Sequence, residues 1–142
     1  MIPKTDIEIR PITSDDLPSV RALWSACGLQ PSSSDTDVRL KTVIRNLGNL
    51  FLIARQGDDL VGSVMGSFDG RRGWINRLAV HPSARGRGLG ESLLREVETA
   101  LRMRGCDKVN LLIEPENVAV QDYYARHGYT RDELIFMEKW IV

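Results

Sequence analysis

This chain of 142 residues has few of the side chains that build disulfide frameworks or metal centres. Its two cysteines, Cys27 and Cys106, lie far apart in the sequence, and its two histidines are isolated from each other. Two distant cysteines predict free thiols in a reducing compartment rather than a disulfide-stabilised fold. No group of cysteine and histidine residues has the spacing of metal ligands, so we expect no bound metal.

The chain also lacks an excess of charge and any long apolar run. Its 19 Lys and Arg residues balance 19 Asp and Glu residues, which gives no broad electrostatic surface for nucleic acid or an anionic membrane. No apolar run approaches the length that spans a bilayer, and residues 1–6 do not resemble a secretory signal. We therefore expect a cytoplasmic protein without nucleic-acid or membrane partners.

Hydrophobic periodicity and turn residues predict one mixed α/β domain over residues 1–142. Short turns between three consecutive strands favour an antiparallel meander, and a helical crossover to the next strand implies that the strands it joins are parallel. The predicted order is β-α-α-β-β-β-α-β-α-β. Its strands are expected at 7–12, 50–54, 60–68, 74–80, 108–113 and 134–141, and its helices end at Gly28, Gly48, Gly105 and Gly128.

An arginine–glycine loop between the third meander strand and its helix is the most informative segment. In Val80–Gly90 the glycines fall at alternate positions, 86, 88 and 90. Glycine lets a bound group approach the backbone closely, and the first amides of the following helix have no partner within the helix. With Arg85 and Arg87 beside these amides, the segment is typical of a pyrophosphate cradle.

Two better-known phosphate loops do not fit this segment. A P-loop requires Lys and then Ser or Thr after its last glycine, whereas Glu91 and Ser92 follow Gly90. A dinucleotide fingerprint requires G-x-G-x-x-G, and Glu91 occupies the place of its third glycine. An ordinary glycine-rich turn remains the alternative.

A second motif runs from Asn117 through Tyr124 to the pair Gly128–Tyr129. Together with Arg85-x-x-Gly88-x-Gly90 after a Val-His-Pro turn, it resembles the GNAT acyltransferases, and the two motifs stand in the order that this family has. The family often has alanine where this chain has Val120, a departure that leaves the tyrosine in register. The resemblance covers essentially the whole chain and implies the GNAT fold, in which the parallel fourth and fifth strands splay apart.

The resemblance implies that acetyl-CoA is the acyl donor. Pantetheine would lie against the fourth strand, with Leu78 and Val80 offering backbone groups and Ala79 between them pointing the other way. Asn117 would cap its helix and contact the cofactor. The pyrophosphate would be bound by the backbone of the loop, namely Arg85, Gly86, Arg87, Gly88, Leu89 and Gly90.

The implied reaction is direct transfer of an acetyl group to an amine. Tyr124 matches the family's general acid, which would protonate the leaving CoA sulfur. Glu114, at the end of the fifth strand, is the candidate general base, with Glu116 as the next choice. Asn76 on the fourth strand is an alternative that would orient a water molecule. His81 is expected to have a structural role in its turn.

Other points remain open at the level of sequence. The acceptor amine belongs to a small molecule or to a protein or peptide, and the resemblance implies that its pocket is formed by 24–37, by 69–73 and by the C-terminal strand at 134–141. A module that binds acyl-CoA without turnover is the alternative function, and an interaction domain that reuses the fold is a third. The apolar last strand at 134–141 would present an unpaired edge, so a homodimer is a hypothesis.

Overall fold

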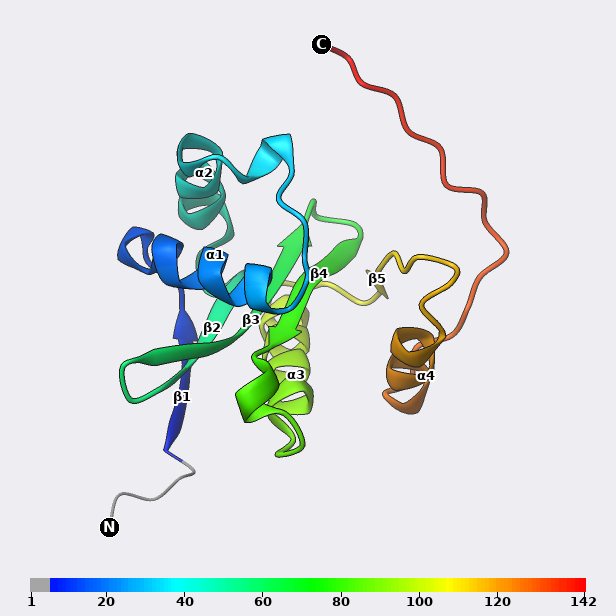
Figure 1. Cartoon of the computed structure of the whole chain (residues 1–142). Coiled ribbons are helices and arrows are strands. Elements are labelled where there is room, and N and C mark those ends of the chain that lie inside the picture. Colours follow the sequence, from blue (N-terminus) through cyan, green and yellow to red (C-terminus); the bar gives the residue numbers. More distant parts are fainter. Residues whose placement is uncertain (1–5) are drawn as a thin grey trace. The chain divides into compact units, whose positions relative to one another are not determined.

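One sheet organises the N-terminal part of the chain, with its five strands in sequence order from β1 to β5 (Figure 1). The structure is a computed structural model that describes residues 6–142; residues 1–5, which bear on the prediction about a secretory signal, lie outside it. The described chain divides into two compact units, 6–111 and 112–142. The strands of the first unit are β1 (Ile7–Pro11), β2 (Phe51–Gln56), β3 (Asp59–Phe68), β4 (Gly73–Val80) and β5 (Val109–Asn110).

The topology confirms the predicted α/β fold class with a mixed sheet. Strands β1 to β4 pair antiparallel with their neighbours, and β4 pairs parallel with β5. The turn between β3 and β4 is held by Asp69, whose Oδ1 accepts the amides of Arg72 at 2.9 Å and Arg71 at 2.8 Å. These hydrogen bonds hold the pKa of the Asp69 carboxyl below its ordinary value.

Helices cover both faces of this sheet (Figure 1). Helix α3 (Leu89–Met103) packs so closely on one face that a Cβ at Gly66 would lie 2.7 Å from Cγ2 of Val97. Helices α1 (Leu17–Ala26) and α2 (Asp37–Leu47) cover the other face. The core on that side consists of fully or nearly fully buried apolar residues, among them Val20, Leu23, Trp24, Leu40, Phe51, Ile53 and Ala79.

An ion-pair cluster secures the start of α1 to the sheet. Asp16 is 4% exposed, and its carboxylate accepts hydrogen bonds from Arg10 at 2.8 and 3.0 Å, from Arg55 at 3.3 Å and from the amide of Thr13 at 2.9 Å. The Arg10 guanidinium, followed by the Thr13 amide, lowers the pKa of Asp16 to about 2. The same pairing raises the pKa of Arg10.

The C-terminal unit contains helix α4 (Val118–Arg126) and the extended chain that follows it. Asn117 caps this helix, as predicted, by accepting the amide of Val120 on Oδ1 at 3.3 Å. The helix ends at Arg126 with His127 as its C-cap, and Gly128 follows with a φ of +90°, in the terminating position predicted for it.

Two predicted strands differ from the structure. The strand expected at 108–113 is reduced to Val109–Asn110, and the one expected at 134–141 does not form. Seven large apolar residues of the range 134–142 are therefore exposed by 62% or more: Leu134, Ile135, Phe136, Met137, Trp140, Ile141 and Val142. A strand is completed by the backbone of a neighbour, so apolar and β-branched residues alone do not create one.

Two further observations bear on the sequence predictions. Both cysteines are free thiols, with Cys106 buried and Cys27 partly exposed, as predicted. Within residues 6–142, no helix combines the length and apolar character needed to cross a bilayer.

Candidate active site

The outer edge of β4 is open along most of its length. Strand β5 pairs with it only at Gly73 and Trp74, so within the described sheet the edge from Ile75 to Val80 has no neighbouring strand on that side. Leu78 and Val80 are partly buried on this segment. Ala79 is 6% exposed and belongs to the core cluster under α1 and α2. Its side chain therefore points into the core and away from any ligand lying along the edge.

The turn after β4 has a rigid internal structure. The Nδ1 atom of His81 accepts the amide of Ser83 at 3.1 Å and lies 2.8 Å from the Ser83 hydroxyl. His81 is thus the N-cap of the 3₁₀ helix Pro82–Ala84, which agrees with the structural role predicted for it. The Arg85 side chain folds back, and its Nε donates to the carbonyl of Val80 at 2.9 Å.

The glycine loop leaves a series of backbone amides without partners. Gly86 and Gly88 have φ values of +81° and +76°, and no atom lies within 4 Å of the position that a Cβ would take at either residue. Gly88 is the N-cap of α3, and the first amide to donate within the helix is that of Ser92, to the Gly88 carbonyl at 3.0 Å. Within the described residues, the amides from Gly86 to Glu91 donate no hydrogen bond to the protein.

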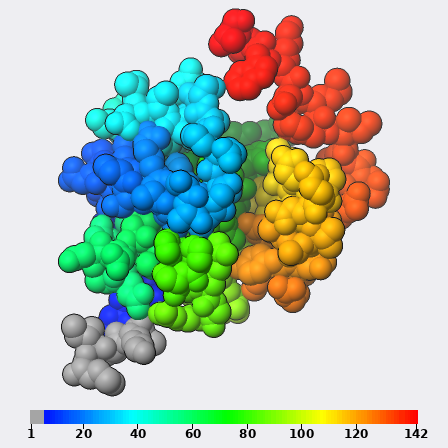
Figure 2. Space-filling view, viewed as in Figure 1, coloured from blue at the N-terminus to red at the C-terminus, as the bar shows by residue number. Residues whose placement is uncertain are grey.

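This arrangement fits a polyanion. Unpaired amides at the start of a helix carry partial positive charge, and the open space beside the glycines allows oxygen atoms to approach them. The Arg87 guanidinium adds charge while its Nη2 donates to the carbonyl of Ser83 at 3.1 Å. The loop lies at the surface of the face shown in Figure 2, in bright to yellowish green, and the residues from Arg85 to Gly88 are exposed.

A bulge interrupts β4 within the open segment from Ile75 to Val80. The register passes from Met65↔Asn76 to Ser63↔Ala79, so β4 holds one more residue than β3 in this interval. Arg77 lies in the bulge with a φ of +54°, the only non-glycine residue of 6–142 with a positive φ. Its carbonyl accepts the hydroxyl of Ser63 at 2.7 Å.

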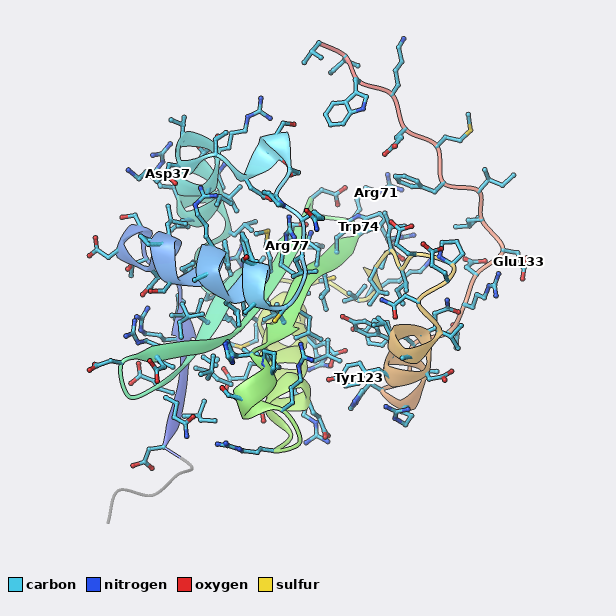
Figure 3. All side chains as sticks on the ribbon, in the orientation of Figure 1. Asp37, Arg71, Trp74, Arg77, Tyr123 and Glu133 are labelled. Carbon is cyan, nitrogen blue, oxygen red and sulfur yellow. The ribbon has the colours of Figure 1, made fainter. Side chains whose placement is uncertain are left out.

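The Arg77 side chain reaches the segment between α1 and α2 (Figure 3). Its Nη2 donates to Oδ2 of Asp35 at 2.6 Å and to the carbonyl of Gln30 at 3.3 Å, and its guanidinium lies 4.8 Å from the centre of the Trp24 ring. A pocket of about 260 Å³ opens beside these groups and is lined by Arg21, Trp24, Ser25, Gly28, Leu29, Gln30, Pro31, Asp35 and Arg77. It overlaps the predicted acceptor region at 24–37 but includes no residue of 69–73.

The C-terminal unit carries the other predicted site residues. Tyr124 is 9% exposed, and its ring packs edge-on against Tyr129, with centroids 5.3 Å apart, and against Tyr123 at 5.4 Å. Glu114 is exposed, and its carbonyl accepts the amide of Asn117 at 2.9 Å. Glu116 is exposed as well, in the turn before α4.

Sequence reasoning missed Ser63, the bulge at Arg77 and the ion pair between Arg77 and Asp35. Ser63 had one available signal, because it is a lone hydroxyl in an otherwise apolar segment of β3 and is fully buried. The bulge at Arg77 and its ion pair with Asp35 had none, because arginine seldom adopts a positive φ and the two residues are 42 positions apart.

The sequence and the fold of this chain are similar to those of known proteins. The sequence profile described as "Acetyltransferase (GNAT) family" matches residues 17–129. An acetyltransferase of Sodalis glossinidius is 35% identical over 137 residues, and one of Pectobacterium atrosepticum is 35% identical over 136, each match covering 96% of both chains. The PaiA N-acetyltransferase of Thermoplasma acidophilum, solved in complex with coenzyme A, has a similar fold, with a TM-score of 0.80, 19% identity and coverage of 92% of this chain and 94% of that one.

Proposed function

Because this chain belongs to the GNAT family of acetyltransferases, we propose that it transfers the acetyl group of acetyl-CoA directly to a primary amine. The observation that carries the proposal is the series of unpaired amides from Gly86 to Glu91, which begins one short turn after the open edge of β4. Unpaired amides at the start of a helix bind a diphosphate, and the open edge of a strand binds an extended arm that carries amide groups. Family members use acetyl-CoA, and a structural relative was solved with coenzyme A.

The pyrophosphate would be held by the backbone of Arg85, Gly86, Arg87, Gly88, Leu89 and Gly90. The pantetheine arm would lie along β4 beside Leu78 and Val80. The Val80 carbonyl already accepts Nε of Arg85 at 2.9 Å and Sγ of Cys27 at 3.4 Å, so we assign the contact there to the Val80 amide. Ala79 would contribute only backbone continuity, and Asn117 would add a side-chain contact.

The amide of Leu78 is the proposed donor to the acetyl carbonyl oxygen. The carbonyl of Arg77 is turned toward Ser63, and the C=O and N–H of a trans peptide point in opposite directions. The Leu78 N–H therefore points away from Ser63. A fixed donor at this place would stabilise the negative charge that develops on the carbonyl oxygen during acyl transfer.

Two further groups complete the proposed chemistry. An alkylammonium has a pKa of about 10.4, so the acceptor must lose a proton before it attacks, and Glu114 or Glu116 would accept that proton. A thiol has a pKa of about 8.5, so the leaving sulfur gains from a proton donor, which we assign to the phenol of Tyr124.

We also propose that the two units act as one domain over residues 1–142, since the family profile at 17–129 includes parts of both. The exposed apolar segment Leu134–Val142 is our candidate for contact between two copies of the chain. Analytical ultracentrifugation of the full chain and of a chain ending at Glu133 tests this. A dimer that depends on the segment supports the assignment, and a monomer at high concentration contradicts it.

The activity is tested by release of free CoA thiol from acetyl-CoA with a panel of polyamines, amino acids, aminoglycosides and N-terminal peptides. Turnover with an amine, together with acetylated product by mass spectrometry, is the expected result. Binding of acetyl-CoA without turnover by any amine would instead favour a module that binds acyl-CoA without reaction.

A further inference from the structure

We propose that Ser63 and Trp24 are positioning residues that fix the direction of the peptide between Arg77 and Leu78. We call the chain of hydrogen bonds from the Trp24 indole through the Ser63 hydroxyl to the Arg77 carbonyl the Trp24–Ser63 relay. The inference rests on the proposed function, because the importance of this peptide lies in the Leu78 amide and its donation to the acetyl carbonyl.

The geometry of the relay determines where its protons lie. Nε1 of Trp24 is 2.9 Å from Oγ of Ser63, and that Oγ is 2.7 Å from the carbonyl oxygen of Arg77. An indole N–H can only donate, and a carbonyl oxygen can only accept. The single hydroxyl proton of Ser63 must therefore point to Arg77, while a lone pair receives the indole proton.

The relay is buried and held firmly. Ser63 is 0% exposed and Trp24 is 4% exposed. The Trp24 ring stacks nearly parallel to that of Phe51, with centroids 6.3 Å apart, and carries the Arg77 guanidinium 4.8 Å from its centre. Because water is excluded from Ser63, loss of its hydroxyl would leave the Trp24 N–H without its partner.

The bulge explains why this peptide needs such support. In a regular antiparallel pair the backbone of β3 would fix the direction of each β4 peptide, but the register shift removes that control between Asn76 and Ala79. The positive φ of Arg77 also costs free energy, because the left-handed region brings the Cβ of an L-residue too close to its own backbone. The Ser63 hydroxyl takes the place of the missing backbone partner and keeps the Arg77 carbonyl turned inward.

An outward Leu78 amide follows from an inward Arg77 carbonyl. A donor that is already oriented before the charge develops stabilises that charge without the cost of reorientation. The relay would therefore affect the reaction by orienting the Leu78 amide, although neither Trp24 nor Ser63 would touch the acetyl group.

The direct test is the carbonyl stretching frequency of a bound analogue. Acetyl-dethia-CoA, a ketone in which methylene replaces the thioester sulfur, is labelled with ¹³C at the carbonyl and measured by difference infrared spectroscopy on the full chain. Hydrogen bonding from Leu78 should lower the frequency in the wild-type complex relative to the analogue in water. Ser63→Ala should lose most of this shift while the Kd of the analogue, measured by calorimetry, changes less than about twofold, because the pyrophosphate and pantetheine contacts remain.

Two other variants make the result decisive. Ser67→Ala is the matched control. It also deletes a serine hydroxyl from β3, but the Ser67 hydroxyl makes no hydrogen bond within the described residues, so this variant should keep the full shift. Trp24→Phe keeps a large ring but removes the N–H that orients Ser63, and it should lose part of the shift; this variant decides the matter if Ser63→Ala does not fold.

An unchanged shift in Ser63→Ala, or an equal loss in Ser67→Ala, overturns the relay. Absence of analogue binding to the wild-type protein has a different meaning, because it contradicts the proposed function itself.

Discussion

The guanidinium of Arg77 on β4 lies 2.6 Å from the carboxylate of Asp35, which belongs to the segment between α1 and α2. Both side chains are largely buried, with 19% and 11% exposed. Oδ2 of Asp35 also accepts the amide of Ser32 at 3.0 Å, so the ion pair ties a turn of the segment to the bulge. Arg77 thus joins the proposed oxyanion site to a wall of the pocket that overlaps the predicted acceptor region at 24–37.

The bulge predicts an unusual order of stability for substitutions at Arg77. Both Arg77→Ala and Arg77→Gly lose the ion pair, but only glycine adopts a φ of +54° without strain. Arg77→Gly should therefore be as stable as Arg77→Ala or up to about 1 kcal/mol more stable, as measured by urea unfolding. At Leu52, in the regular part of β2, glycine should be less stable than alanine. If the glycine variant were less stable than the alanine variant at Arg77 as well as at Leu52, the positive φ assigned to Arg77 in the bulge would be contradicted.

Asp16 should make stability depend on pH in the acid range. Its pKa is about 2 in the folded protein against 3.8 for an ordinary aspartate. A lowered folded pKa means that its contribution is fully present above pH 4 to 5 and is lost as the pH falls toward 2. Asp16→Asn should cost roughly 2 kcal/mol at pH 7, and the difference from wild type should shrink below pH 4. Asp15→Asn, an exposed neighbour, is the control, and a pH-independent deficit in Asp16→Asn would contradict this account.

Backbone geometry rather than arginine charge should dominate binding of CoA. Gly88→Val forces a β-branched residue into a φ of +76°, which should displace the loop amides and weaken CoA binding about tenfold or more. Arg87→Ala removes an exposed charge worth about 0.5 kcal/mol and should weaken binding only two- to threefold. Calorimetry with CoA measures both, and circular dichroism checks the fold. Greater loss in Arg87→Ala would show that charge, not the main chain, holds the pyrophosphate.

The two adjacent tyrosines of α4 provide a test of the proton donor. Tyr124→Phe should lower kcat about 100-fold with little change in the KM for acetyl-CoA, because general acids contribute about 10²- to 10⁴-fold. Tyr123→Phe, which deletes the same atom one position earlier, should change kcat less than threefold. Equal rates for Tyr124→Phe and wild type would remove Tyr124 from the proposed chemistry.

Local sequence signals were enough to predict most of the first unit and the start of α4 in the second. The meander, the crossover through α3 and the cap at Asn117 each depend on residues that are close in sequence. The glycine loop was predictable for the same reason, since alternate glycines next to a helix start dictate a flexible backbone with unpaired amides.

Features that depend on distant partners were not predictable. The segment 134–141 has the composition of a strand, but composition does not supply the neighbouring backbone that a strand requires. The bulge at Arg77 depends on Ser63, 14 residues earlier, and on Asp35, 42 residues earlier. Such contacts emerge only when the sheet and the helices on it are assembled.

The most direct test of the central claim is a titration of ¹⁵N-labelled protein with CoA, followed by the amide resonances of the full chain. We predict that the amides from Gly86 to Glu91 shift most and that those of Leu78 and Val80 move with them, because these groups would bind the pyrophosphate and pantetheine. Saturable binding that leaves the Gly86–Glu91 amides unchanged, or no binding at millimolar CoA, would contradict the account.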